Sequence, residues 1–138
     1  MAALTEYINI STKGQGDIID ITPEAAEIVA DKNIQNGILC VFAPGSTAAI
    51  TTIEYEPGLK KDIPLFLERI IPYSAHYHHH DTWHDDNGSS HVQAALIGPS
   101  ISVPIVNNAL TLGTWQQIVL IECDTRPRKR KLVAQLVY

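Results

Sequence analysis

A polar stretch at residues 77–91 interrupts the hydrophobic pattern of the chain and limits which residues can build its core. It contains every histidine except His76, and its apolar residues follow neither a helical nor a strand period. We therefore predict a long loop, a kind of segment that inside a compact domain is usually functional or disordered. The aromatic residues Tyr77 and Trp83 argue against disorder. The rest of the chain is then expected to be a scaffold that holds this loop.

The flanking residues predict a β-rich scaffold. Alternating or continuous apolar residues bounded by turn residues predict strands at 4–10, 18–21, 38–43, 48–55, 92–97, 101–106, 109–112, 114–123 and 132–138. The run 38–43 is apolar throughout, which favours a central strand buried on both faces. Helical spacing predicts one helix from a Thr22 cap to Asn36 and Gly37, and a second over 60–71 with Asp62 as candidate cap. The chain is therefore expected to form an α+β domain of about eight strands with two helices on the outer faces of its sheets.

Length and charge restrict the function classes. A chain of 138 residues is expected to form one domain, residues 1–138, with one core. Its net charge of −5 opposes nucleic acid as the partner, although residues 126–131 are a basic run. No apolar run is long enough to span a membrane, and the N-terminus lacks the basic start and apolar segment of a signal peptide. We expect a cytoplasmic protein that binds neither nucleic acid nor membrane.

The chain has two cysteines, Cys40 and Cys123. Each lies in an apolar, strand-like segment. Two free, buried thiols of a cytosolic protein explain this placement, and a single disulfide stays open as the alternative.

The polar stretch combines imidazole and carboxylate side chains, which together suit zinc, iron, nickel or manganese. A glycine-containing turn between His79 and His91 would bring these two side chains together, and Asp85, Asp86 and Asn87 offer oxygen atoms between them. Zinc held by such ligands with one open position forms a hydrolytic or Lewis-acid site. An exposed polar loop that collects metal adventitiously explains the same residues.

Other candidate residues lie outside this stretch. The small-residue loop 44–47 contains Ser46 and Thr47, which can present hydroxyl and N–H groups to an anion, and a plain turn is the alternative. Glu54, at a strand end, is either a site carboxylate or a surface charge. Trp115, at a strand start, is expected in the core more often than in a site.

Four segments carry a resemblance to a known family: residues 46–59, 77–91, 96–104 and 112–118. In this order they resemble the YjbQ-like family, whose members are described as secondary thiamine-phosphate synthases, and the basic run 126–130 looks like the family's as well. In the family the second segment looks like Tyr-x-His followed by Thr-Trp-x-Asp-Gly-Asn-Gly-His-Ser-His. Its first His, Asp, Asn and last His fall here on His79, Asp85, Asn87 and His91.

Two positions depart from the family pattern: Asp86 stands where the family has Gly, and Ser89 stands where it has the middle His. The resemblance implies a two-sheet, sandwich-like domain that assembles as a homotrimer, with a cleft near residues 77–91 that subunits can share. It also implies a weak thiamine-phosphate synthase activity, which joins a pyrimidine pyrophosphate to a thiazole phosphate and releases pyrophosphate.

That reaction needs positive charge at the leaving pyrophosphate, which arginines or a divalent cation supply. Arg128 and Arg130 are therefore candidates for phosphate binding, and a solvated basic strand edge is the alternative. The substrate-binding candidates are Ser46, Thr47, Ser90, Trp115, Gln116, Arg128 and Arg130, the catalytic candidates are Asp85, Glu54 and Asn87, and the metal ligands are His79 and His91. The expected cofactor is a divalent metal, zinc first and magnesium as the alternative.

Two function hypotheses follow. The first is a metal-assisted enzyme, a thiamine-phosphate synthase-like transferase or a hydrolase, that acts on a small phosphorylated heterocyclic substrate. The second is a non-catalytic trimeric protein that binds a metal or a ligand, in which Ser89 marks the loss of a family histidine. A nucleic-acid-binding arm at 126–131 is a third hypothesis, which the net acidity opposes.

Overall fold

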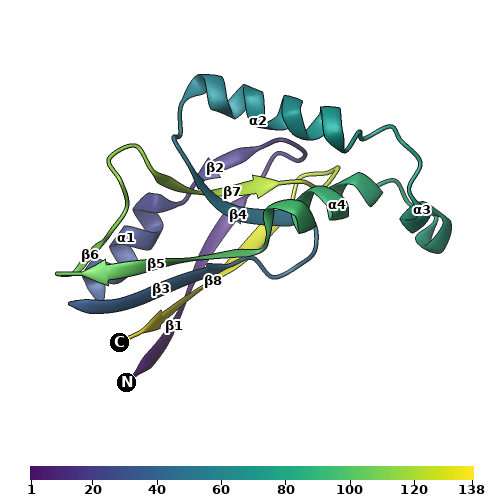
Figure 1. Ribbon diagram of the computed structural model, residues 1–138. Helices are drawn as coiled ribbons and strands as arrows, with labels where there is room; N and C mark the ends of the chain where they lie inside the picture. Colours follow the sequence, from purple (N-terminus) through teal and green to yellow (C-terminus); the bar gives the residue numbers. More distant parts are fainter.

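Two antiparallel sheets form the structure, a computed structural model that describes residues 1–138 (Figure 1). The strands are β1 (Ala3–Ser11), β2 (Ile18–Asp20), β3 (Asn36–Phe42), β4 (Ala48–Ile53), β5 (Ser100–Val106), β6 (Ala109–Leu110), β7 (Gln117–Glu122) and β8 (Lys129–Val137). The helices are α1 (Thr22–Asp31), α2 (Pro57–Ile70), α3 (His78–Trp83) and α4 (Gly88–Ile97). One sheet has the order β1-β8-β3-β5-β6 and the other the order β2-β7-β4. The predicted α+β fold with eight strands in two sheets is confirmed, but the structure has four helices where two were expected.

The main core lies between the two sheets. Leu39, Leu132 and Leu136 point inward from the five-stranded sheet and are fully buried. Ile118 and Leu120 meet them from β7 of the three-stranded sheet. Each such side chain contributes about 1.5–3 kcal/mol when it leaves water. The alternating pattern of the sequence therefore reflects strands that bury one face against a partner sheet.

Strand β7 is the strand that is buried on both faces. Its second set of side chains, Val119 and Ile121, packs with Cys123 and with Ala94 of α4 in a smaller apolar cluster. Ile63 of α2 also contacts this cluster. Helices α2 and α4 therefore cover the outer face of the three-stranded sheet, as Figure 1 shows. The expectation that helices lie on outer faces is confirmed for α2, whereas α1 packs Ala25 and Val29 into the main core.

Strand β3 corrects one prediction. It is central, between β8 and β5, as expected from its apolar run. Its side chains nevertheless alternate between buried and accessible positions, and Ile38 and Phe42 are 49% and 41% exposed. The prediction that both faces are buried was wrong, because only one face of the five-stranded sheet has the second sheet against it.

The polar stretch is not one long loop. Residues 78–83 form α3, and residues 88–97 form α4, which also replaces the strand predicted at 92–97. The apolar residues at 92–97 have enough strand propensity to suggest a strand from the sequence. Tertiary packing decides for a helix, because α4 buries Ala94 against Val119 and Ile121 of β7.

Two helix boundaries also differ from the predictions. The cap residue of α1 is Ile21, and the Thr22 hydroxyl accepts a hydrogen bond from the Ile118 N–H at 2.8 Å, which ties α1 to β7. Helix α1 ends at Asp31, before Asn36 and Gly37, which already belong to β3. Helix α2 begins at Pro57 and is capped by Glu56, so Asp62 is inside it.

None of the four helices has the length and apolar composition needed to cross a membrane.

Glu56 is expected to stabilise the start of α2 in a pH-dependent way. Its carboxylate accepts hydrogen bonds from the N–H groups of Gly58 at 2.8 Å and Leu59 at 2.5 Å, which hold its pKa below the ordinary value of 4.5. The stabilisation is therefore present above the ordinary carboxyl pKa and is lost as the pH falls through the lowered folded-state pKa. Glu56→Ala should lower the melting temperature at neutral pH, and the difference from wild type should shrink on acidification. The neighbouring exposed charge at Glu54 gives the control, Glu54→Ala, and an equal effect of both variants would contradict the capping role.

The two cysteines are free thiols, so the disulfide alternative is not realised. Cys123 is buried, and burial together with the adjacent Glu122 raises its pKa to about 12. Because thiolate is the reactive form, we expect iodoacetamide at about pH 8 to modify the half-buried Cys40 and to spare Cys123 in the folded protein. Peptide mass spectrometry checks this result, with labelling in urea as the control in which both thiols react. Equal labelling of both in the folded protein would contradict it.

Candidate functional site

The turn between α3 and α4 depends on Gly88. A Cβ atom at this position would lie 2.5 Å from Tyr77 Cβ and 2.9 Å from His80 Nε2. The Gly88 N–H donates to that same His80 Nε2 at 3.0 Å. His84 closes α3 with a left-handed φ of 56°. The absence of a side chain at position 88 therefore lets α3 lie against the first turn of α4.

Four of the predicted side chains meet at this turn. His79 Nε2 lies 3.3 Å from Asp85 Oδ2, and the ring centroid of His79 lies 4.3 Å from that of His91. The Asn87 side chain fits best with its amide nitrogen donating to His79 Nε2 at 3.1 Å and to the Asp85 carboxylate at 3.2 Å. Two imidazoles, a carboxylate and an amide in contact can bind a divalent cation or move a proton.

The pKa of His91 lies below the ordinary imidazole value. Burial is the largest cause and the adjacent His79 acts in the same direction, while the carboxylates of Asp124 and Asp85 oppose the shift. A lowered pKa favours the neutral imidazole at neutral pH. That form binds metal ions and accepts protons, so it suits either role of the site.

Asp124 is a buried carboxylate next to this turn. Arg128 donates to Asp124 Oδ2 from Nε at 2.9 Å and from Nη2 at 2.5 Å, and the Thr47 hydroxyl donates to the same oxygen at 3.0 Å. Burial alone would raise the pKa of Asp124, but the hydrogen bonds from Arg128, Thr125 and Thr47 outweigh it and lower the pKa. Asp124 therefore stays ionised at neutral pH.

Glu122 forms a second buried ion pair. Arg130 donates to its carboxylate from Nε at 2.9 Å and from Nη2 at 2.6 Å, and the Thr12 hydroxyl donates at 2.8 Å. The Asp124 N–H donates to Glu122 Oε1 at 3.0 Å, and Arg130 Nη2 also donates to Thr47 Oγ1 at 2.9 Å. The two ion pairs thus form one connected network at the end of β7.

Neither Glu122 nor Asp124 was predicted as a site residue. Their positions in the sequence are the one signal that could have found them. They flank Cys123 at the end of an apolar run, where a carboxylate is expected to be buried and therefore to need a paired cation. Arg128 and Arg130 were predicted to hold phosphate, and the structure pairs each with one of these carboxylates. Lys129 of β8 is exposed, but β8 lies between β1 and β3, so the alternative of a basic strand edge is not borne out.

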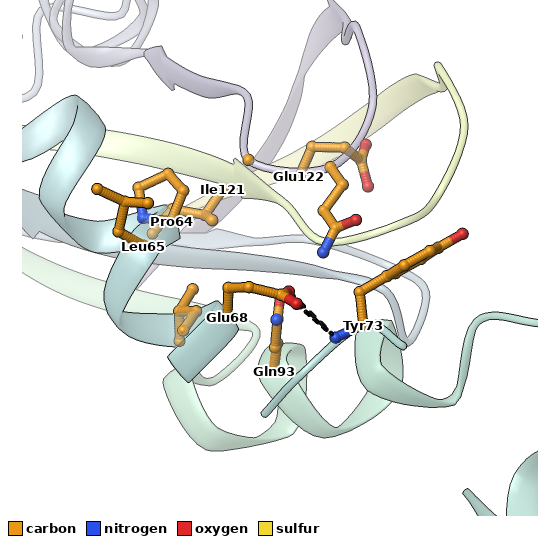
Figure 2. A pocket seen from close by; sticks show the side chains of 10 residues that line it. Pro64, Leu65, Glu68, Tyr73, Gln93, Ile121 and Glu122 are labelled. Carbon is orange, nitrogen blue, oxygen red and sulfur yellow. Dashed lines mark hydrogen bonds between the residues drawn. The ribbon is translucent and has the colours of Figure 1, made fainter. Parts of the chain in front are cut away.

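A pocket of about 390 Å³ lies on the other side of Glu122 (Figure 2). Its apolar wall is formed by Pro64, Leu65, Leu67 and Ile121. Polar atoms come from Glu68, Tyr73 and Gln93, and both oxygens of Glu68 accept from the Tyr73 N–H at 3.1 Å. Such a mixture of an apolar wall and a few polar groups suits a small organic ligand.

The polar end of this pocket adjoins the buried carboxylates. Burial raises the pKa of the Tyr73 hydroxyl, and the nearby carboxylates of Asp86 and Asp124 raise it further. Tyr73 is therefore a neutral hydrogen-bond donor between the pocket and the α3–α4 turn.

A second cleft, of about 360 Å³, lies on the opposite side of α4. Ser46 and Gly45 line it from the loop before β4, and His91 and Ala94 line it from α4. The predicted candidates Ser46 and His91 therefore share a surface accessible to a ligand.

Three predicted residues lie away from this site within the chain. Glu54 is exposed beyond the end of β4, and Gln116 donates to Thr52 Oγ1 at 3.0 Å. Gln116 is therefore far from the site, because its partner Thr52 follows the site residue Thr47 by five positions, a distance of about 16 Å along a strand. Trp115 is 71% exposed, so the expectation that it lies in the core was wrong. Its strand starts only at residue 117, which leaves the indole on a turn.

Ser89 and Ser90 occupy the first turn of α4. Both are fully buried, and neither hydroxyl oxygen has a hydrogen-bond partner. An unpaired buried hydroxyl is uncommon, because burial without a hydrogen bond costs free energy. Ser90 was a predicted substrate contact, and its hydroxyl lies buried in the first turn of α4.

Comparisons with known proteins place the chain among uncharacterised relatives. The family described as UPF0047 protein YjbQ-like matches residues 6–138. A UPF0047 protein of Methanothermobacter thermautotrophicus is 39% identical over 132 residues, which cover 96% of this chain and 90% of that protein. The UPF0047 protein YugU of Bacillus subtilis is 32% identical and covers 92% of this chain and 94% of its own length.

Solved structures of similar proteins share the fold. A hypothetical protein from Aeropyrum pernix superposes with a TM-score of 0.90 at 30% identity, covering 97% of this chain and 98% of its own. A YbjQ-like protein of unknown function from Sulfolobus solfataricus superposes with a TM-score of 0.87 at 30% identity, covering 98% of both chains.

Proposed function

Because the chain belongs to the YjbQ-like UPF0047 family, we propose that it is a metal-assisted enzyme acting on a small phosphorylated heterocyclic substrate, with weak thiamine-phosphate synthase activity as its specific form. The observation that carries this proposal is the meeting of His79, Asp85, Asn87 and His91 at one turn. These residues come from two helices that Gly88 allows to touch. Side chains of these types gathered in one half-buried place are characteristic of catalytic sites.

The side chains at this turn are of the chemical types that bind a divalent metal. His79 and His91 supply imidazoles, of which His91 is held neutral, and Asp85 supplies a carboxylate. Imidazole with carboxylate suits zinc, while magnesium would require more oxygen ligands. The ligand atoms of these three residues do not all lie within 4.8 Å of one another, so binding needs side-chain rotation toward a common point. A bound divalent cation would neutralise negative charge on a phosphorylated substrate.

The residues of the chain have separate roles in the proposal. Asn87 and Asp85 orient the His79 ring through their contacts with Nε2. Arg128 is half-exposed, and its Nη1 makes no hydrogen bond within the chain, so this group and Ser46 can contact phosphate oxygens. Arg130 is only 10% exposed, and its Nε and Nη2 donate to Glu122 and Thr47. We therefore assign Arg130 and Thr47 to holding the site rather than to substrate.

The proposed reaction is a substitution at carbon. A C–N bond forms between the methylene carbon of the pyrimidine pyrophosphate and the thiazole nitrogen, and the C–O bond to pyrophosphate breaks with its electron pair leaving on oxygen. Arg128 would stabilise the negative charge on the leaving pyrophosphate, and a divalent cation, when bound, would supply further positive charge there. The pyrimidine ring would bind in the cleft lined by Ser46 and His91, because only one methylene group separates this ring from its pyrophosphate.

The proposal includes a homotrimer. Helices α2 and α4 form a groove of about 350 Å³ between them, lined by Ile63, Phe66, Leu96 and Ile97. Phe66 and Leu96 are 56% and 60% exposed, and an apolar surface of this kind supports contact with another subunit. Glu54, Trp115 and Gln116 would then reach a site only in a neighbouring subunit. Sedimentation equilibrium of the untagged protein tests this part.

The activity is tested by pyrophosphate release from the two thiamine precursors mixed with the zinc-loaded protein. Release that requires both precursors and is lost in His91→Ala is expected. His84→Asn is the matched control, because His84 is an exposed histidine of the same segment with a left-handed φ that asparagine adopts readily. No release from wild type, or equal release from wild type and His91→Ala, would contradict the enzyme proposal.

A second candidate function is a non-catalytic trimeric protein that binds a metal or a ligand. The observation that favours it is the serine at position 89. This residue stands where related sequences have a histidine, and its buried hydroxyl has no partner. Stabilisation of the fold by phosphorylated heterocycles without any turnover would support this candidate over the enzyme.

A further inference from the structure

A second group of metal-ligand side chains lies around the start of α3, apart from the site described above. His76 Nε2 lies 3.1 Å from Asp81 Oδ2, and His78 Nδ1 lies 3.8 Å from the same oxygen. The three ligand atoms all lie within 4.8 Å of one another, which is not so for His79, Asp85 and His91. We call His76, His78 and Asp81 the outer cluster.

The spacing of the outer cluster matches a tetrahedral metal. Zinc bonds of about 2.0–2.1 Å at tetrahedral angles place neighbouring ligand atoms about 3.3 Å apart. The observed separations of 3.1 and 3.8 Å need only small rotations of the side chains to reach this value. All three side chains are more than half exposed, so a fourth position stays open to water. The only ring contacts of His76 are edge contacts with His78 and His80.

The outer cluster is separate from the site at the α3–α4 turn. His78 and Asp81 are three residues apart and share one face of α3, whereas His79 turns toward α4 and contacts His91. His80 Nε2 is occupied by the Gly88 N–H and is not available as a ligand. Helix α3 thus presents one set of ligand groups to solvent and another to α4.

Helix α3 is short, and its contacts are those that His79 and His80 make with α4 and with the turn before it. It has six residues, none of them buried, and its cap residue Tyr77 makes no side-chain capping hydrogen bond. Isolated helices of this length are not stable in water. A metal held by His76 before the helix and by His78 and Asp81 within its first turn would join these segments.

We propose that His76, His78 and Asp81 form a second site for a divalent transition metal such as zinc, which fixes α3 and thereby the position of His79. Nitrogen and carboxylate ligands in this number favour zinc, nickel or cobalt over magnesium or calcium. The exposed position predicts weaker binding than at an enclosed site, with exchange against metal in solution. The outer site does not depend on the proposed enzyme activity.

Zinc titration of chelator-treated, untagged protein by calorimetry tests the outer site. The variant His76→Asn/His78→Asn removes two of its ligands, and His79→Asn/His91→Asn removes those of the turn. Wild type is expected to bind two ions per chain, and each double variant one. His84→Asn is the matched control and should bind as wild type, because His84 is an exposed histidine outside both groups. Unchanged binding in His76→Asn/His78→Asn, or an equal loss in His84→Asn, would overturn the proposal.

The same variants separate this proposal from the enzyme proposal. If wild type binds a single ion that is retained in His79→Asn/His91→Asn and lost in His76→Asn/His78→Asn, the outer site stands while the metal-assisted enzyme fails. Amide hydrogen exchange then tests the role of the metal. Zinc should slow exchange over residues 78–84 in His79→Asn/His91→Asn, and no slowing would overturn the claim that the outer site fixes α3.

Discussion

Arg130→Met is expected to lower the free energy of unfolding by about 3–5 kcal/mol, the cost of leaving one member of a buried ion pair without its partner. The variant removes the three hydrogen bonds from Arg130 to Glu122 and Thr47. Glu122 is fully buried, so its charge would then be opposed only by the Thr12 hydroxyl and the Asp124 N–H. Methionine keeps much of the apolar volume, so the loss reports the charge and hydrogen bonds rather than a cavity. Urea denaturation measures the change.

Lys129→Met is the matched control, because Lys129 is the exposed neighbour on the same strand, and its change should be small. In the double variant Arg130→Met/Glu122→Gln both charges are gone. It should therefore be less destabilised than the sum of the two single variants. Additive effects, or a loss no greater than that of Lys129→Met, would show that the pair does not support the end of β7.

Gly88→Ala is expected to open the contact between α3 and α4. The added Cβ would meet Tyr77 Cβ at 2.5 Å and His80 Nε2 at 2.9 Å, so the helices must separate. Overpacking of this kind costs about 1–3 kcal/mol of stability. Separation of the helices also moves His79 away from His91, and metal binding at the turn should be lost. Urea denaturation and zinc titration measure the two effects.

The two explanations predict stability changes of opposite sign for Gly88→Ala. Alanine is favoured over glycine within a helix by about 1 kcal/mol, so without the close contact Gly88→Ala would stabilise α4. Gly113→Ala is the control, because its Cβ would meet only Gln116 atoms at 3.6 Å or more, an ordinary contact. A stabilised Gly88→Ala that keeps wild-type zinc binding would contradict the role of Gly88.

Strand β1 was predictable because it buries one face and therefore alternates in the sequence. Helix α4 was not predictable in this way, since the residues at 92–97 suit a strand and only packing against β7 decides for a helix. The same holds for β3, where the sequence does not tell which sheet face lacks a partner.

The site was predictable where it depends on neighbours in the sequence. His79, Asp85, Asn87 and His91 lie within one short segment, so a turn brings them together whatever the fold around it. The buried carboxylates Glu122 and Asp124 were missed, because the threonines that donate to them, Thr12 and Thr47, come from distant parts of the chain that only the fold brings together.

The central claim is that the α3–α4 turn holds a metal through His79 and His91. The direct test is elemental analysis of untagged protein purified without added metal, in the His76→Asn/His78→Asn background that removes the outer cluster. About one metal per chain is expected in this background. The metal should be lost on adding His79→Ala/His91→Ala, with the melting transition retained. A background protein without metal, or metal content unchanged by the added substitutions, would contradict the claim.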